Sequence, residues 1–125
     1  MTPPEVLIVE DNDKNLKLAR DVLEFAGFTV RVAMSGEAAV AEAHRRQPDV
    51  ILMDLHLPGI DGHTALALLR GDDLTSSIPV VAVTASAMAS DRDHALAAGF
   101  DGFLEKPISV RDFPAQVRRH LQAEG

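Results

Sequence analysis

Five polar side chains stand at the ends of short apolar runs in the sequence, or two residues beyond them. They are Glu10, Asp11, Asp54, Thr84 and Lys106. If these runs are neighbouring parallel strands, their carboxyl ends meet at one edge of a sheet, and the three carboxylates converge there. Carboxylates that close together repel one another unless one is protonated or a cation lies between them. A hard divalent cation suits such oxygen ligands, and Mg²⁺ is favoured because it keeps waters and leaves room for a phosphate.

Lys106 would bring a second positive charge to the same crevice. A lysine opposite a divalent cation can clamp a phosphoryl group during transfer. Asp54 could then act as the nucleophile and form an aspartyl phosphate. The alternative is that these residues are surface charges at strand ends, with Asp11 as a helix cap and Asp54 as a turn former. Because four strand ends all carry suitable groups, the sequence favours a phosphoryl-transfer site.

Five apolar runs are expected to form the strands that position these groups. They are residues 6–9, 29–33, 50–53, 80–83 and 102–104. The first, third and fourth are apolar at every position, which is typical of strands buried on both faces of a parallel sheet. The second run contains Arg31 and suits an edge strand.

The segments between these runs have the apolar spacing of helices. We expect helices from about residue 16 to 26, from a cap at Ser35 to about 46, around 66–69, from 86–90 to 98, and from a cap at Ser109 onward. Pro114 would fall just past the first turn of that last helix and would cost a backbone hydrogen bond. Strand and helix alternate five times, which predicts a single doubly wound α/β domain with right-handed crossovers.

Four segments that contain these residues resemble the CheY-type receiver family of two-component signalling. The segments are residues 7–12 (LIVEDN), 48–59 (PDVILMDLHLPG), 78–85 (IPVVAVTA) and 105–108 (EKPI). The resemblance covers essentially the whole chain in order, so residues 1–125 are interpreted as one receiver (response regulatory) domain. It implies a flavodoxin-like, CheY-like (βα)5 fold whose five-stranded parallel sheet has the order 2-1-3-4-5.

The same resemblance implies a role for each residue at the metal. Asp54 would be the phosphoacceptor and a metal ligand together with Asp11. Glu10, where the family more commonly has aspartate, is expected to reach the metal through water. His56 would contribute its backbone carbonyl. The implied cofactor is Mg²⁺, with Mn²⁺ as an alternative.

Further roles concern the phosphoryl group and the response to it. Thr84 and Lys106 would bind the phosphoryl oxygens and complete a catalytic set with Asp54. The Lys106–Pro107 peptide would be cis, which is accessible before proline. Thr84 and Phe103 would form the switch, with Phe103 at a position where many members have tyrosine.

We therefore expect a phosphorylation-controlled binding module rather than a turnover enzyme. A sensor histidine kinase or histidine phosphotransfer protein would donate the phosphoryl group. No effector segment follows Leu121, so the output is expected to be a protein contact. The resemblance places that contact on the fourth helix, fifth strand and fifth helix, at residues 90–121.

Other interpretations stay open from the sequence. An aspartate-nucleophile phosphatase is disfavoured because His56, two residues after Asp54, lacks the carboxylate for acid catalysis. A receiver that binds partners without phosphorylation is disfavoured by the complete set of acids, Thr84 and Lys106. Residues 12–18 and 83–88 are similar to stand-alone regulators of the DivK cell-cycle type, and also to receivers attached to hybrid kinases.

The composition further restricts the class of protein to which this chain can belong. The 125 residues suit one domain, and 46% hydrophobic residues suit a globular core. A net charge of −7 disfavours direct contact with nucleic acid. With no cysteine, signal peptide or long apolar run, a cytoplasmic protein outside the membrane is expected. The histidines show no paired ligand spacing and are expected on helix surfaces.

Overall fold

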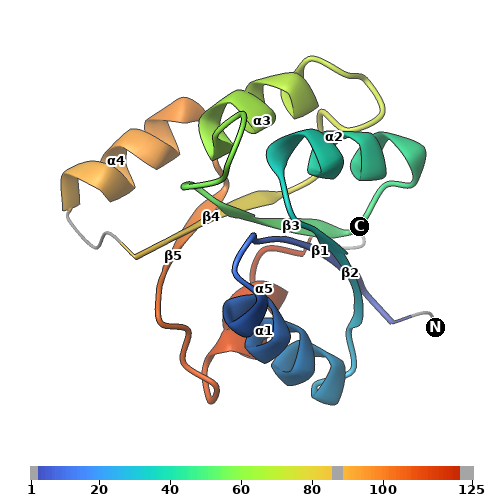
Figure 1. Ribbon diagram of the computed structural model, residues 1–125, viewed down its shortest axis with the longest axis vertical. Coiled ribbons are helices and arrows are strands. Elements are labelled where there is room, and N and C mark those ends of the chain that lie inside the picture. The colour runs from blue at the N-terminus through green and yellow to red at the C-terminus, as the bar shows by residue number, and fades with distance from the viewer. Residues whose placement is uncertain (1–2, 86–88, 122–125) are drawn as a thin grey trace.

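The protein, described by a computed structural model over residues 3–85 and 89–121, is an alternation of five strands and five helices (Figure 1). The strands are β1 (Glu5–Val9), β2 (Thr29–Ala33), β3 (Val50–Asp54), β4 (Val80–Thr84) and β5 (Gly102–Glu105). The helices are α1 (Asp13–Phe25), α2 (Gly36–Arg45), α3 (Gly62–Arg70), α4 (Ala89–Ala98) and α5 (Phe113–Arg118). All strand pairs are parallel in the order β2-β1-β3-β4-β5, which confirms the predicted fold.

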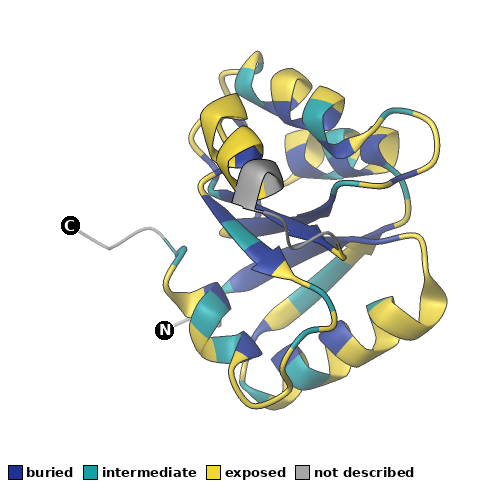
Figure 2. Cartoon of the chain, turned by 90° about the vertical axis from the view of Figure 1, so that its left-hand side faces the viewer, coloured by how far each residue is buried: buried dark blue, intermediate teal, exposed yellow. Residues whose placement is uncertain are grey.

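Helices cover both faces of the sheet. Figure 1 shows α2, α3 and α4 on one side and α1 and α5 on the other. Successive side chains of β1 alternate between the two layers: Leu7 and Val9 pack in the core under α2 and α3, and Val6 and Ile8 in the core against α1 and α5. Figure 2 shows the sheet buried between exposed helix surfaces. The three central strands β1, β3 and β4 are buried throughout, whereas the edge strand β2 is partly exposed.

Side-chain caps start the helices that follow β1, β2 and β3. The Asn12 carboxamide oxygen accepts hydrogen bonds from the amides of Lys14 and Asn15 at 3.0 Å each. Ser35 caps α2, as the sequence predicted, and the Asp61 carboxylate caps α3. Each cap satisfies backbone amides that have no partner within the first turn of its helix, and so fixes where that helix begins. The chain therefore turns back over the sheet right where the polar residues of the site lie.

The last helix differs from its prediction. α5 begins at Phe113 rather than at Ser109, so Pro114 lies in the first turn, where a missing amide costs no helical hydrogen bond. Ser109 closes a preceding turn instead, with its carbonyl accepting from the Phe113 amide at 2.8 Å. The expected start of the fourth helix falls partly on residues 86–88, outside the described residues. No described helix has the length and apolar character needed to cross a membrane.

Candidate functional site

The sheet register brings the predicted acidic residues together. β1 and β3 pair with Val9 opposite Met53, so Glu10, which follows β1, and Asp54, the last residue of β3, lie at the same sheet edge. One carboxylate oxygen from each of Glu10, Asp11 and Asp54 lies within 4.8 Å of the others. Glu10 and Asp54 are buried, whereas Asp11 is exposed. The predicted convergence of three carboxylates is confirmed, and their hard oxygen atoms suit a divalent cation such as Mg²⁺.

Lys106 completes this acidic triad from the end of β5. Its Nζ atom lies 2.5 Å from Oε1 of Glu10 and 2.8 Å from Oδ2 of Asp54. The Lys106 amide donates to the Thr84 carbonyl at 2.8 Å, which holds the backbone of the lysine beside the end of β4. The Lys106–Pro107 peptide bond is cis. The second Asp54 oxygen, Oδ1, accepts from the His56 amide at 2.9 Å. Both oxygens of Asp54 are therefore held by the protein.

These contacts shift the pKa values of Glu10, Asp54 and Lys106, and not all in the same direction. Burial raises the pKa of Glu10, and the neighbouring Asp54 carboxylate raises it further, against the effect of Lys106. Burial also acts to raise the pKa of Asp54, but Glu10, Lys106 and the His56 amide together bring it below its usual value. Burial acts to lower the pKa of Lys106, and the two carboxylates outweigh it, so the net shift is upward. Asp54 is thus held as a carboxylate, the form a nucleophile requires.

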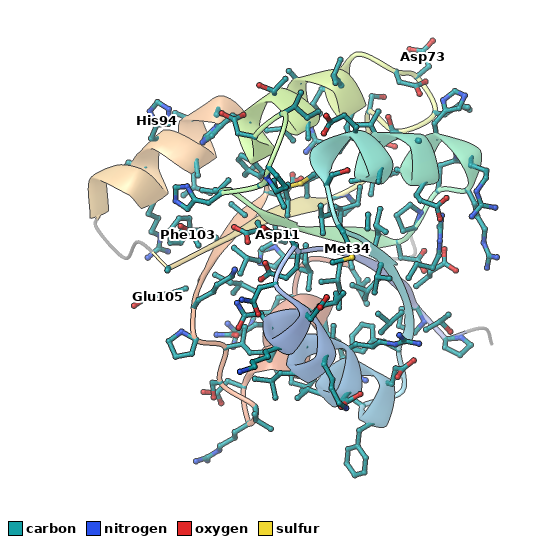
Figure 3. All side chains as sticks on the ribbon, viewed as in Figure 1. Asp11, Met34, Asp73, His94, Phe103 and Glu105 are labelled. Atoms are coloured by element: carbon teal, nitrogen blue, oxygen red, sulfur yellow. The ribbon has the colours of Figure 1, made fainter. Side chains whose placement is uncertain are left out.

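A groove of about 640 Å³ opens beside the triad. Its lining includes Asp11, His56, Asp61, His63, Thr84 and His94. This site groove has room for a cation, its waters and a phosphoryl group. Thr84 is buried at the end of β4, and Phe103 is half-buried on β5, packed against the core under α2 and α3. Figure 3 shows Phe103 below α4, from which His94 projects.

Two histidines of this groove lie together, although the sequence predicted no pair of histidine ligands. The rings of His63 on α3 and His94 on α4 meet edge to face, with centroids 5.3 Å apart. His63 also packs against the ring of Phe100 at 5.4 Å. Sequence spacing could not reveal this pair because the two residues belong to different helices. Asp61 also lines this groove, and its carboxylate caps α3 by accepting from the Thr64 amide at 2.8 Å.

The sequence profile of the response regulator receiver domain matches residues 6–118. The chain belongs to the response regulator receiver family. The polar-differentiation response regulator DivK of Brucella anthropi is 40% identical over 119 residues, which cover 95% of this receiver and 97% of that protein. This receiver is thus DivK-like in sequence as well as CheY-like in fold.

Solved receiver structures agree with this assignment. The chemotaxis response regulator CheY4 of Vibrio cholerae superposes with a TM-score of 0.90 at 26% identity, covering 96% of this receiver and 100% of that chain. The receiver domain of a sensor histidine kinase from Pseudomonas aeruginosa gives 0.87 at 34% identity, covering 94% and 97%. That structure has a magnesium ion coordinated in its active site cleft. Receiver domains bind Mg²⁺ at an acidic site, and the triad of this receiver is compatible with one.

Proposed function

We propose that this receiver accepts a phosphoryl group onto Asp54 and transmits a signal through the resulting change in shape. The observation that carries the proposal is the contact between Lys106 Nζ and Asp54 Oδ2 at 2.8 Å, inside a cluster of three carboxylates. An ammonium group beside a buried carboxylate can move its hydrogen bond to a phosphoryl oxygen once the phosphoryl group is attached to that carboxylate. The donor would be the phosphohistidine of a sensor kinase or of a histidine phosphotransfer protein.

Glu10, Asp11 and Asp54 would hold Mg²⁺, with the backbone carbonyl of His56 as a further ligand and Mn²⁺ as an alternative ion. Glu10 already contacts Lys106, which favours its acting on the ion through water. Bound Mg²⁺ would neutralise negative charge on the phosphoryl oxygens. The triad supplies only oxygen ligands, which is the donor set that Mg²⁺ prefers.

In the transfer step, Oδ2 or Oδ1 of Asp54 attacks the phosphorus, and the bond from phosphorus to the donor nitrogen breaks. The electron pair of that bond stays with the donor imidazole, and an acyl phosphate forms on Asp54. Lys106 moves its hydrogen bond from the carboxylate to a phosphoryl oxygen, and the Thr84 hydroxyl binds another. The protein thus acts by position and charge, as is general in phosphoryl transfer.

The output surface that we propose lies on α4, β5 and α5. Phe103 on β5 is half-buried against the core. Attraction of Thr84 toward the phosphoryl group would leave space that Phe103 can fill, which shifts the population between two packings. The chain would thereby promote its own phosphorylation and dephosphorylation and would not turn over other substrates.

Labelling with acetyl phosphate and Mg²⁺ tests the acceptor. Wild-type protein should gain one base-labile phosphoryl group, and Asp54→Asn should gain none. Asp61→Asn is the matched control, because Asp61 lines the same groove but lies outside the triad, and it should be labelled as wild type is. Stoichiometric labelling of Asp54→Asn at another residue would overturn the proposal.

An aryl phosphate separates this function from that of an aspartate-nucleophile phosphatase. Such enzymes need a second acid near the nucleophile, and here the residue two positions beyond Asp54 is His56. We expect no sustained release of inorganic phosphate from an aryl phosphate in the presence of Mg²⁺. Many turnovers per protein molecule would support the phosphatase instead.

A further inference from the structure

Three of the five histidines of the chain line the site groove, and two of them are in direct contact. His63 lies in the first turn of α3, and His94 lies in the middle of α4. Their rings meet at 5.3 Å between centroids with an interplanar angle of 71°. Within the described residues, neither ring has a hydrogen bond or an ion pair to the protein, so their nitrogen atoms remain available to a ligand.

The ring separation fits two imidazoles that share one ion. Tetrahedral coordination with Zn–N bonds of about 2.0–2.1 Å places the two ring centres roughly 5 Å apart. Imidazole nitrogen suits Zn²⁺, Ni²⁺ and Cu²⁺, whereas Mg²⁺ prefers oxygen. The pair and the acidic triad of Glu10, Asp11 and Asp54 would therefore select different metals, although both border one groove.

We propose that His63 and His94 form a binding site for a divalent transition-metal ion of the Zn²⁺ class, separate from the acidic triad. The carboxylate of Asp61, two residues before His63, lines the same groove and contributes negative charge near the ion. Among the described residues, the triad is the one group in which three potential ligands lie within 4.8 Å. The histidine pair thus supplies two protein ligands, and water fills the remaining positions.

An ion bound by both rings would tie α3 to α4. His94 is exposed on α4, so an ion can reach it from solvent, and His63 packs edge to face against the ring of Phe100. The site therefore has one ligand packed against an aromatic ring and one at the surface. This proposal does not depend on phosphorylation of Asp54, because within the described part of the chain neither ring is hydrogen-bonded or ion-paired to the triad or to Lys106.

Nickel titration of the full, tag-free chain in excess Mg²⁺ tests the site. Paramagnetic Ni²⁺ should broaden the ring resonances of His63 and His94 before those of His44 and His120, and Zn²⁺ should raise the melting temperature. His94→Gln should remove both effects, and as a surface substitution it should leave the fold and the Mg²⁺ response intact. His44→Gln is the matched control. The exposed His44 ring lies 2.5 Å from an Asp72 carboxylate oxygen, so it represents an ordinary surface site at which Ni²⁺ could bind.

The outcomes separate a metal site from a stacking contact. If Ni²⁺ broadens His44 as early as His94, or if His94→Gln binds Ni²⁺ as wild type does, the proposal is wrong. The His63–His94 pair would then be an aromatic contact only, which the same separation also allows. His63→Gln should reproduce the loss seen with His94→Gln, since both rings are needed.

Discussion

The ammonium group of Lys106 lies 2.8 Å from the Asp54 carboxylate, across 52 residues of sequence. The side chains are only 19% and 7% exposed, so water screens the pair weakly. Removing the lysine would leave the buried Asp54 carboxylate beside Glu10 without a cation. This relationship makes Lys106 a structural counter-ion as long as no phosphoryl group is attached.

Substitution Lys106→Ala should therefore destabilise the metal-free protein, by about 3 kcal/mol as for other buried charge pairs that lose one partner. Urea unfolding in EDTA would measure the loss. Lys17→Ala provides the control, because the Lys17–Asp21 pair is exposed and should contribute well under ~1 kcal/mol. Equal effects of the two substitutions would contradict the role of Lys106.

Mg²⁺ should stabilise the fold because it relieves repulsion within the triad. A ligand that binds only the native state at ten times its Kd adds about 1.4 kcal/mol, which raises the Tm by several degrees. Asp11→Ala should remove this metal-dependent shift. If millimolar Mg²⁺ leaves the melting temperature of the wild-type protein unchanged, the result would argue against the site.

Gly62→Ala should be destabilising, by about 1–3 kcal/mol. A Cβ atom at Gly62 would lie 2.8 Å from the Asp54 carbonyl oxygen and 3.0 Å from Cα of Leu55, and backbone cannot easily move away. Gly71→Ala is the matched control, because its nearest neighbour would be at 3.4 Å and its φ of −82° suits alanine. Thermal unfolding of both variants would show a loss at Gly62 alone.

Glu42 should titrate far below an ordinary glutamate. Hydrogen bonds from Arg45, then Arg31, lower the pKa of Glu42 to about 2 from 4.5. Since the folded value lies below the unfolded one, the stability from this carboxylate is present above pH 4.5 and is lost as the pH falls toward 2. Carboxyl-carbon NMR should show the Glu42 midpoint rising in Arg45→Gln and unchanged in Lys17→Gln.

Thr84→Ala should separate phosphorylation from signalling. Asp54, the metal ligands and Lys106 remain in this variant, so it should still accept a phosphoryl group. Without the hydroxyl, Phe103 should lose its coupling to the site, and the phosphorylated variant should bind its target as the unphosphorylated protein does. Wild-type affinity of phosphorylated Thr84→Ala for that target would rule out the switch.

Much of the fold follows from local patterns in the sequence. Continuous apolar runs at 50–53 and 80–83 identified the central strands, and Ser35 identified the start of α2. The carboxylate convergence also followed, because parallel strands share an edge. The start of α5 did not follow from the sequence. Ser109 is a residue type typical of helix caps, yet it closes a turn that precedes the helix.

Contacts between distant helices were out of reach of sequence spacing. The meeting of His63 and His94 depends on how α3 and α4 pack, and no pattern within either helix encodes it. The direct contact of Lys106 with Glu10 was similarly missed, because the lysine was expected to face the phosphoryl group. In both cases tertiary packing decides which polar atoms meet.

The last helix also has a consequence for the way the chain is made. The Arg118 guanidinium lies 4.7 Å from the Phe28 ring centroid and donates to the Ala26 carbonyl at 2.6 Å, so α5 closes over the end of α1. A nascent chain released before residue 106 would carry the triad without its lysine and α1 without its cover. Such early termination products would expose apolar surface, as incomplete domains do, and would be open to aggregation and proteolysis. The chain must therefore be synthesised through Arg118 before the domain can shield its own core from the cell's proteases.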